Sequence, residues 1–328
     1  MTLDELKSLP KVELHCHLDG SLSSQFIQAR LGRFVPESGL RVDDNCASLQ
    51  EYLEKFALPG QCLTDEEGLF EAGYDVLANM SKENVCYAEI RFSPLLHVTE
   101  KMNVQRVIAS LLAGLNKASK EFGIDYNVII CAMRHFNEED NYNMIKASYE
   151  FLGRGVCAVD LAGAEASYPM SEFMNLFEKV RRDGMPFTIH AGECGSVKNI
   201  LDSIEVGAKR IGHGIAMAGH SEVQALVKEK QIGIEMCPIS NLQTKAVKEK
   251  SDYPIKEFIN AGLLVTVNTD NRTVSNTTLV KELELIQKNY GITDEEVMLM
   301  MKNAIDVSFA DAKCKEKLLK KISDYRKR

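Results

Sequence analysis

The sequence predicts an α/β protein built as a closed (β/α)8 barrel, or TIM barrel, and three observations support this fold class. Along the 328 residues, eight short apolar runs alternate with longer amphipathic stretches that have helical periodicity. Several of the runs are apolar almost throughout, as strands buried on both faces are. Glycines such as Gly123, Gly184, Gly207 and Gly262 stand where the intervening helices should end. The eight predicted strands are Val12–His17, Val85–Phe92, Asp125–Met133, Val156–Leu161, Pro186–His190, Arg210–His213, Ile232–Met236 and Leu264–Asn268.

An open doubly wound sheet is the structural alternative, but no G-x-G-x-x-G motif follows the first predicted strand. The connection from His17 to Val85 is abnormal, because βα connections usually have only ~2–6 residues. We expect residues 21–80 to form a helical cap inserted after strand 1, over the barrel mouth and within one domain, 1–328. C-terminal helices follow the last strand, and Lys315 to Arg328 supplies cations that suit a helix C-terminus.

The composition limits the partners that the protein can have. Hydrophobic residues make up 45% and charged residues 26%, as in ordinary globular proteins, and the net charge is −8. This charge argues against nucleic acid or an anionic membrane as a partner, so we expect a neutral or cationic small molecule. The nine cysteines include no Cys-x-x-Cys, the N-terminus has no signal-peptide pattern, and no apolar run approaches ~20 residues. These features predict a cytoplasmic protein with free thiols, and they give no indication of the oligomeric state.

The first predicted strand carries two histidines, His15 and His17. Side chains alternate between the two faces of a strand, so these two imidazoles point the same way and can share a metal ion. The alternative is a buried strand that happens to contain two histidines.

Other polar residues stand at the C-terminal ends of predicted strands, where the active site of a barrel lies. His190 ends strand 5, His213 ends strand 6, and Asp270 follows strand 8, so that four of the seven histidines meet at one rim. Three imidazoles and one carboxylate suit one zinc ion with water in an open position. Such a metal lowers the pKa of its bound water to ~7. Glu193, three residues after His190, is a candidate proton shuttle, and its alternative role is that of a first-turn helix glutamate.

Six motifs occur in order along the chain, and together they resemble those of the adenosine deaminases, a family of the metal-dependent amidohydrolase superfamily. The resemblance extends from about Pro10 to beyond Asp270. The motifs are His15-Cys16-His17-Leu18-Asp19-Gly20, Asp160-Leu161-Ala162-Gly163, His190-Ala191-Gly192-Glu193, Gly212-His213-Gly214, Cys237-Pro238-Ile239-Ser240 and Asn268-Thr269-Asp270.

The resemblance implies an adenosine or 2′-deoxyadenosine deaminase that produces inosine or deoxyinosine and ammonia. Glu193 would protonate purine N1 while zinc hydroxide attacks C6, and His213 would orient the hydroxide and stabilise the charged intermediate. The implied zinc ligands are His15, His17, His190 and Asp270, with His17 also beside the substrate.

The resemblance also implies substrate contacts from Asp19, Gly163 and the cap. The backbone N–H of Gly163 would face purine N3, although this glycine can also serve only as a turn after strand 4. Asp19 would accept the ribose 5′-hydroxyl, and its alternative role is a helix N-cap. Leu53 and Phe56 could wall the base, but packing within the helix core is the interpretation that we favour for this pair.

Asp19 carries information about the substrate, because relatives that deaminate adenine tend to have glutamate there and those acting on N6-methyl-AMP tend to have asparagine. A shorter carboxylate leaves room for a sugar and repels a phosphate, which favours a nucleoside. The alternatives are deamination of adenine or another aminopurine, a different amidohydrolase reaction, or an inactive nucleoside-binding protein. Many other amidohydrolases use two metals bridged by a carboxylated lysine from strand 4, which has no lysine here.

Two positions depart from the usual family pattern. Asn271 replaces an aspartate that is expected to face purine N7, and its amide can donate to that acceptor without being protonated. Ala164 stands where aspartate is common, which removes one hydrogen bond near the metal site but no metal ligand.

Overall fold

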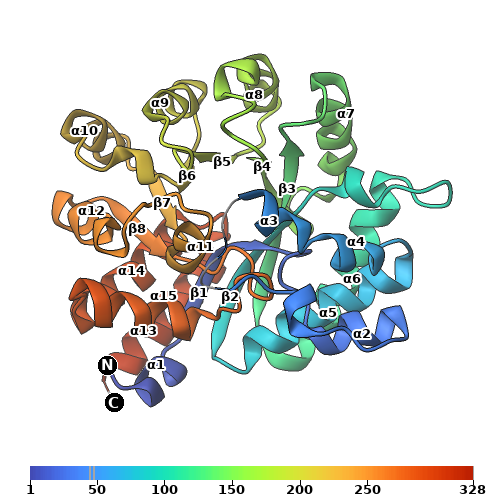
Figure 1. Ribbon diagram of the computed structural model, residues 1–328, viewed down its shortest axis with the longest axis horizontal. Coiled ribbons are helices and arrows are strands. Elements are labelled where there is room, and N and C mark those ends of the chain that lie inside the picture. The colour runs from blue at the N-terminus through green and yellow to red at the C-terminus, as the bar shows by residue number, and fades with distance from the viewer. Residues whose placement is uncertain (44–45, 47–48, 328) are drawn as a thin grey trace.

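The computed structural model describes residues 1–43, 46 and 49–327. Within this part of the chain, eight strands pair in parallel in two four-stranded sheets, β1 to β4 and β5 to β8. Two isolated bridges join the sheets, Val159 with Phe187 and Cys16 with Asp270, so the strands form a closed ring (Figure 1). The predicted (β/α)8 barrel is therefore confirmed. The strands are β1 (Lys11–His17), β2 (Val85–Phe92), β3 (Asp125–Met133), β4 (Val156–Ala162), β5 (Thr188–Ala191), β6 (Arg210–His213), β7 (Gly233–Met236) and β8 (Leu264–Val267).

Helices surround the strands, and their ends follow the expected local signals. For α6 (Val104–Phe122), the side chain of Asn103 accepts from Arg106 N at the start, and Gly123 with φ 71° ends the helix. The other helices of the outer ring are α5 (Glu66–Ser81), α7 (Glu138–Ser148), α8 (Met174–Arg182), α9 (Val197–Val206), α10 (Ser221–Glu229), α12 (Ile255–Ala261), α13 (Leu279–Tyr290) and α14 (Asp294–Val307).

The long connection after β1 contains α2 (Ser24–Leu31), α3 (Leu49–Glu54), α4 (Ala57–Gln61) and α5. In Figure 1, α3 lies in front of the ring of strands, whereas α5 packs beside α6 in the outer ring. Tyr52 of α3 is held to the connection after β8, because its hydroxyl lies 2.7 Å from Ser275 Oγ. The helical insertion thus combines a covering part with one helix of the barrel wall. Residues 44, 45, 47 and 48 of the predicted cap lie outside the described residues, and the single-domain organisation stays a prediction.

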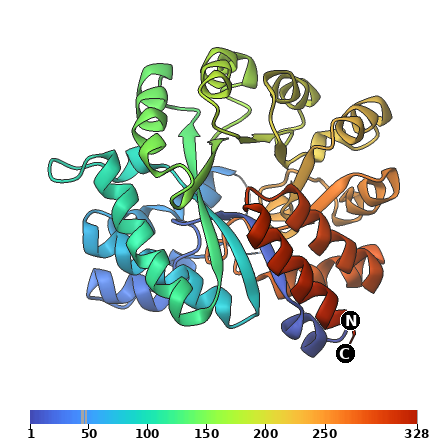
Figure 2. The same ribbon diagram turned by 180° about the vertical axis from the view of Figure 1, so that it is seen from behind.

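Helices at the two ends of the chain complete the fold. The predicted C-terminal helices are present, and α15 (Ala312–Arg326) runs beside α14, with the two termini close together (Figure 2). The hydroxyl of Tyr325 donates to the carbonyl of Glu5 in α1 (Leu3–Ser8) at 2.9 Å. Among the described residues, no helix has the length and apolar character needed to cross a membrane.

Charged side chains occupy the interior of the barrel, which the sequence analysis did not predict. Glu89, Arg91, Asp160, Arg210 and Glu235 all have no exposed surface. Arg91 donates to Asp160 at 2.9 Å and to Glu235 at 2.8 Å, and Arg210 donates to Glu89 and Glu235, both at 2.5 Å. Buried charges are tolerated only when they are paired in this way. The network therefore fixes the positions of β2, β4, β6 and β7 relative to one another below the strand ends.

Candidate metal-dependent active site

Four side chains from β1, β5 and the segment after β8 converge at the C-terminal ends of the strands. His15, His17, His190 and Asp270 each offer one ligand atom, and these atoms all lie within 4.8 Å of one another. The Nε2 atoms of His17 and His190 are 3.2 Å apart, and Asp270 Oδ1 is 3.4 Å from Nε2 of both His15 and His17. The structure therefore brings together the four residues that the resemblance implied as ligands.

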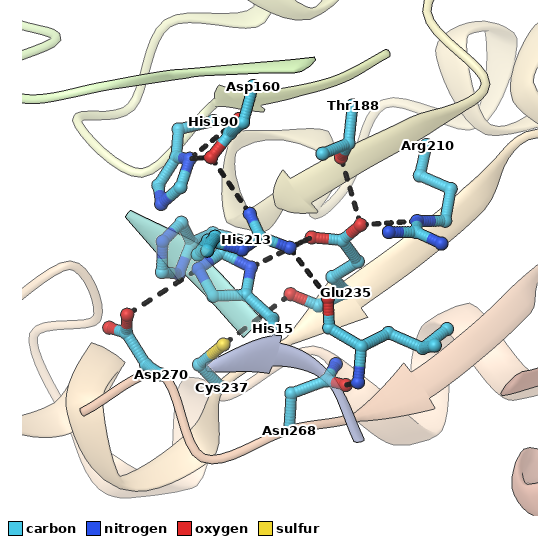
Figure 3. A network of polar contacts seen from close by, with 12 residues as sticks. His15, Asp160, Thr188, His190, Arg210, His213, Glu235, Cys237, Asn268 and Asp270 are labelled. Carbon is cyan, nitrogen blue, oxygen red and sulfur yellow. Dashed lines mark hydrogen bonds and ion pairs between the residues drawn. The ribbon is translucent and has the colours of Figure 1, made fainter. Parts of the chain in front are cut away.

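The outer atoms of the same side chains have partners that direct the remaining lone pairs inward. His15 Nδ1 lies 2.8 Å from Glu235 Oε2, and His190 Nδ1 lies 2.9 Å from Asp160 Oδ2 (Figure 3). Each Nδ1 thus carries the hydrogen and each Nε2 keeps a free lone pair. His15 Nε2 is buried without a hydrogen-bond partner in the described part of the chain. A buried, unpartnered imidazole nitrogen that faces a carboxylate and two other imidazoles fits a divalent metal ion.

Metal ligation requires neutral imidazoles and an ionised carboxylate, and the electrostatics favour these states at His15, His17 and Asp270. At His190 the effect of the Asp160 charge outweighs that of burial and raises the pKa, so a metal ion would compete with a proton there. Burial lowers the pKa of His15 and His17 below its usual value, so both imidazoles are neutral. Burial tends to raise the pKa of the Asp270 carboxyl, but the surrounding imidazoles of His15, His17 and His213 hold it well below its usual range, so this carboxyl is ionised. Ser240 Oγ donates to Asp270 Oδ2 at 2.5 Å, which leaves Oδ1 facing the histidines.

Arg91 connects the two carboxylates that orient the histidines, since Asp160 faces His190 and Glu235 faces His15. Asp160 belongs to one of the six motifs of the sequence, whereas Arg91 and Glu235 belong to none of them. The available signal was a charge inside a strand that is otherwise buried on both faces, which requires a partner in the barrel interior.

A cavity of about 230 Å³ lies at the C-terminal ends of the strands, and three of the four proposed metal ligands, His17, His190 and Asp270, line it. The proposed catalytic residues Glu193 and His213 line it, together with Asp19, Gly163 and Asn271. His15 is not part of the lining and has no exposed side-chain surface. No lysine or arginine is among the described residues that line the cavity. The remaining lining residues are His17, Tyr52, Leu53, Phe56, Phe92, Ser93, Leu96, Cys131, Met133, Ala162, Ala164, His190, Thr244 and Asp270.

His213 and Glu193 face each other across part of the cavity, with 3.8 Å between Nε2 and Glu193 Oε2. The amide of Asn241 lies 2.9 Å from His213 Nδ1, and the hydroxyl of Tyr253 donates to Asn241 Oδ1 at 3.3 Å. Asn241 therefore donates to Nδ1, which places a hydrogen of the His213 ring on Nε2, toward the cavity. The alternative role of Glu193 as a first-turn helix residue is wrong, because α9 begins only at Val197.

The structure also decides between alternatives for Asp19. Ser23, not Asp19, accepts from Phe26 N and caps α2, so the helix-cap alternative for Asp19 is wrong. Burial raises the pKa of Asp19 to about 6. This value is still below neutral pH, so the carboxyl is mostly ionised at that pH. The side chain lies at the cavity wall, where an ionised carboxylate can accept from a hydroxyl.

The remaining predicted contacts also lie at the cavity. Gly163 has φ 109°, a conformation that side chains rarely adopt, so glycine is required there for backbone reasons. Asn271 is 3% exposed, and its Oδ1 is buried without a partner among the described residues. A Cβ atom at Gly20 would lie 1.9 Å from this Oδ1, so the close approach requires glycine.

Two cavity residues from α3 were misjudged or missed. Leu53 is 44% exposed and lines the cavity, so packing within the helix core is wrong for this residue. Tyr52 is 3% exposed and also lines the cavity, but the sequence analysis did not name it. Its position one residue before Leu53 gave no signal, because the direction of each side chain depends on how α3 lies on the barrel.

Together, the fold and the converging donors define a barrel of the amidohydrolase class with a candidate metal site. The sequence model described as adenosine deaminase matches residues 10–325. An adenosine deaminase from Clostridium botulinum strain Hall is 39% identical over 326 residues, covering 94% of this chain and 96% of that protein. An adenosine deaminase from Enterococcus faecalis is 38% identical over 331 residues, covering 98% of each. The chain belongs to the adenosine deaminase family.

Solved structures agree with this fold. An adenine deaminase from Arthrobacter aurescens has a TM-score of 0.87 at 24% identity and covers 98% of this chain and 100% of its own. An N6-methyl-AMP deaminase from Arabidopsis thaliana has a TM-score of 0.85 at 25% identity, with 98% of each chain covered. An amidohydrolase from Burkholderia ambifaria with bound zinc has a TM-score of 0.88 at 20% identity, covering 99% of this chain and 93% of that one.

Proposed function

We propose that this protein is a zinc-dependent adenosine and 2′-deoxyadenosine deaminase. In this reaction water replaces the C6 amino group of the purine, which gives inosine or deoxyinosine and ammonia. The observation that carries the proposal is the convergence of His15, His17, His190 and Asp270 beneath a cavity lined by Glu193 and His213. The relatives named adenosine deaminase, at 38–39% identity over nearly the whole chain, support the choice of substrate.

One metal ion per chain would be held by the three imidazoles and the Asp270 carboxylate. Zinc suits this set of nitrogen and oxygen donors, and the neighbour with bound zinc supports the choice. When bound, zinc lowers the pKa of coordinated water and so supplies hydroxide at neutral pH.

Glu193 and His213 act on two atoms that carry negative charge during the reaction, purine N1 and the oxygen that adds to C6. Protonation of purine N1 by the Glu193 carboxyl makes C6 more electrophilic and leaves the ring neutral after the oxygen has added. The Nε2–H of His213 donates to the oxygen that adds to C6 and stabilises its negative charge. The 3.8 Å between the two side chains suits groups that act on adjacent ring atoms, N1 and C6.

The cavity suits a nucleoside better than a nucleotide. The carboxylate of Asp19 would lie at the 5′ end of the ribose and the described lining contains no lysine or arginine, so a 5′-phosphate would meet negative charge without a basic side chain to balance it. We assign Asp19 to the ribose 5′-hydroxyl, and the backbone N–H of Gly163 to purine N3. The Asn271 amide is assigned to purine N7.

The test measures loss of the adenosine absorbance band and release of ammonia for adenosine, deoxyadenosine, adenine and AMP, together with the zinc content. Adenosine and deoxyadenosine should be deaminated, and Glu193→Gln should abolish the reaction. Glu172→Gln is the matched control, because Glu172 is exposed and distant in sequence from the proposed donors. Preference for adenine would favour an adenine deaminase, and binding without any spectral change would favour a nucleoside-binding protein.

A further inference from the structure

The segment that carries Glu193 turns sharply after β5, and three of its backbone N–H groups donate to the carboxylate of a single residue. Gly192 and Gly195 have φ values of 78° and 86°, which direct successive backbone N–H groups to one side. The side chain of Glu165 receives three of them. Its Oε1 accepts from Gly192 N at 2.7 Å, and its Oε2 accepts from Glu193 N at 2.9 Å and from Cys194 N at 3.1 Å.

Glu165 belongs to a different part of the barrel, because it follows β4 rather than β5. It is 4% exposed, and Asn199 Nδ2 of α9 donates a fourth hydrogen bond to Oε1 at 2.8 Å. Arg134, which follows β3, donates to the carbonyl of His190 at 2.7 Å. Neighbouring β–α connections therefore hold both ends of the short stretch between His190 and Glu193.

The chemistry of the contact requires a carboxylate. An ionised carboxylate has only acceptor sites and can receive four hydrogen bonds, whereas glutamine replaces one acceptor oxygen with an NH2 donor. Whichever way a glutamine amide turned, its NH2 would face at least one backbone N–H or the Asn199 amide, and that donor would lose its partner. The backbone that places the Glu193 side chain would then have to move.

We propose that Glu165 is a positioning residue that sets the place of the Glu193 carboxyl relative to purine N1. The inference rests on the proposed deaminase function, in which Glu193 is the proton donor. A displacement of about 1 Å at a reacting group lowers a rate by about a hundredfold, so Glu165→Gln should lower kcat by about that factor. Metal binding should persist, because the four hydrogen bonds of Glu165 go to Gly192, Glu193, Cys194 and Asn199 and not to the ligand residue His190.

The test compares wild type with Glu165→Gln by kcat for adenosine and by the Kd of 1-deazaadenosine. This analogue has C–H in place of N1, so its binding does not depend on the proton donor. We expect a large fall in kcat, an unchanged Kd for the analogue and an unchanged zinc content. Hydrogen–deuterium exchange should become faster in the peptide containing residues 192–194, and Glu172→Gln should match wild type in every measurement.

A double variant separates positioning from a general structural effect. If Glu165 acts through Glu193, then Glu165→Gln should cause no further loss of the residual rate that a Glu193→Gln variant shows at high enzyme concentration. A further loss there, a parallel loss of analogue binding, or wild-type kcat in Glu165→Gln would overturn the proposal. Should Glu165→Gln fail to fold, Glu165→Asp keeps the charge with a shorter reach, and wild-type kcat in that variant would be equally decisive. An inactive wild-type protein would instead reject the proposed function itself.

Discussion

Replacement of Arg91 by methionine should weaken both the fold and the metal site. The guanidinium has no exposed surface and donates to three groups, Asp160 at 2.9 Å, Glu235 at 2.8 Å and the carbonyl of Leu14 at 2.7 Å. Removal of one member of a buried ionic network leaves the other charges uncompensated, which costs about 3–5 kcal/mol of unfolding free energy. Because Asp160 and Glu235 orient His190 and His15, the zinc affinity should also fall by about 10–100-fold.

The two effects can be measured separately. Urea denaturation of the metal-free protein reports the loss of unfolding free energy, and competition with a chelator of known affinity reports zinc binding. Arg154→Met is the matched control, because Arg154 is exposed and should leave both quantities unchanged. Arg91→Lys should retain more stability than Arg91→Met but cannot reach both carboxylates with a planar pair of donors. Normal zinc affinity in a folded Arg91→Met protein would refute the reasoning.

Three further perturbations have defined outcomes. His97 is 4% exposed, and burial lowers its pKa to about 4 from 6.5, so the folded state disfavours protonation and loses about 3 kcal/mol as the pH falls from 6.5 to 4. In urea denaturation at several pH values, the unfolding free energy of His97→Leu should therefore rise relative to that of wild type on acidification. A difference between the two proteins that does not change with pH would contradict this. His220→Leu is the control, because His220 is exposed. Asn271→Ala should lower kcat/KM for adenosine by an amount equivalent to about 1–3 kcal/mol, and unchanged kinetics would reject the contact with purine N7. Chelation should abolish deamination and lower the thermal unfolding temperature, because the folded state would lose the free energy of metal binding to the three imidazoles and the carboxylate. Added zinc should restore both the activity and the unfolding temperature. Full activity of a metal-free sample would exclude a metal-dependent reaction.

Local patterns in the sequence carried much of the site. The two-residue spacing of His15 and His17 placed both imidazoles on one face of β1, and this holds for any strand. His190, His213 and Asp270 could be assigned to the same rim because parallel strands of a barrel all end on one side. The four proposed ligands lie together in the structure, although their roles stay proposals.

Other functional contacts had no local signal. Glu165 meets Gly192, Glu193 and Cys194 only because β4 and β5 are neighbours and their connections turn toward each other. The direction of the Leu53 side chain depends on how α3 lies across the barrel mouth, and helical periodicity within a short segment cannot determine that.

The sequence by itself determined the alternation of strands and helices, the common face of His15 and His17 on β1, and the set of polar residues at the strand ends. These properties depend on the backbone geometry of single elements, so residues near one another in the chain specify them. The tertiary structure alone decided which buried charges pair, as Arg91 does with Glu235 and Glu165 does with the turn that carries Glu193. Such pairs join segments 28 to 144 residues apart, and their geometry depends on strand register and on how the ring closes.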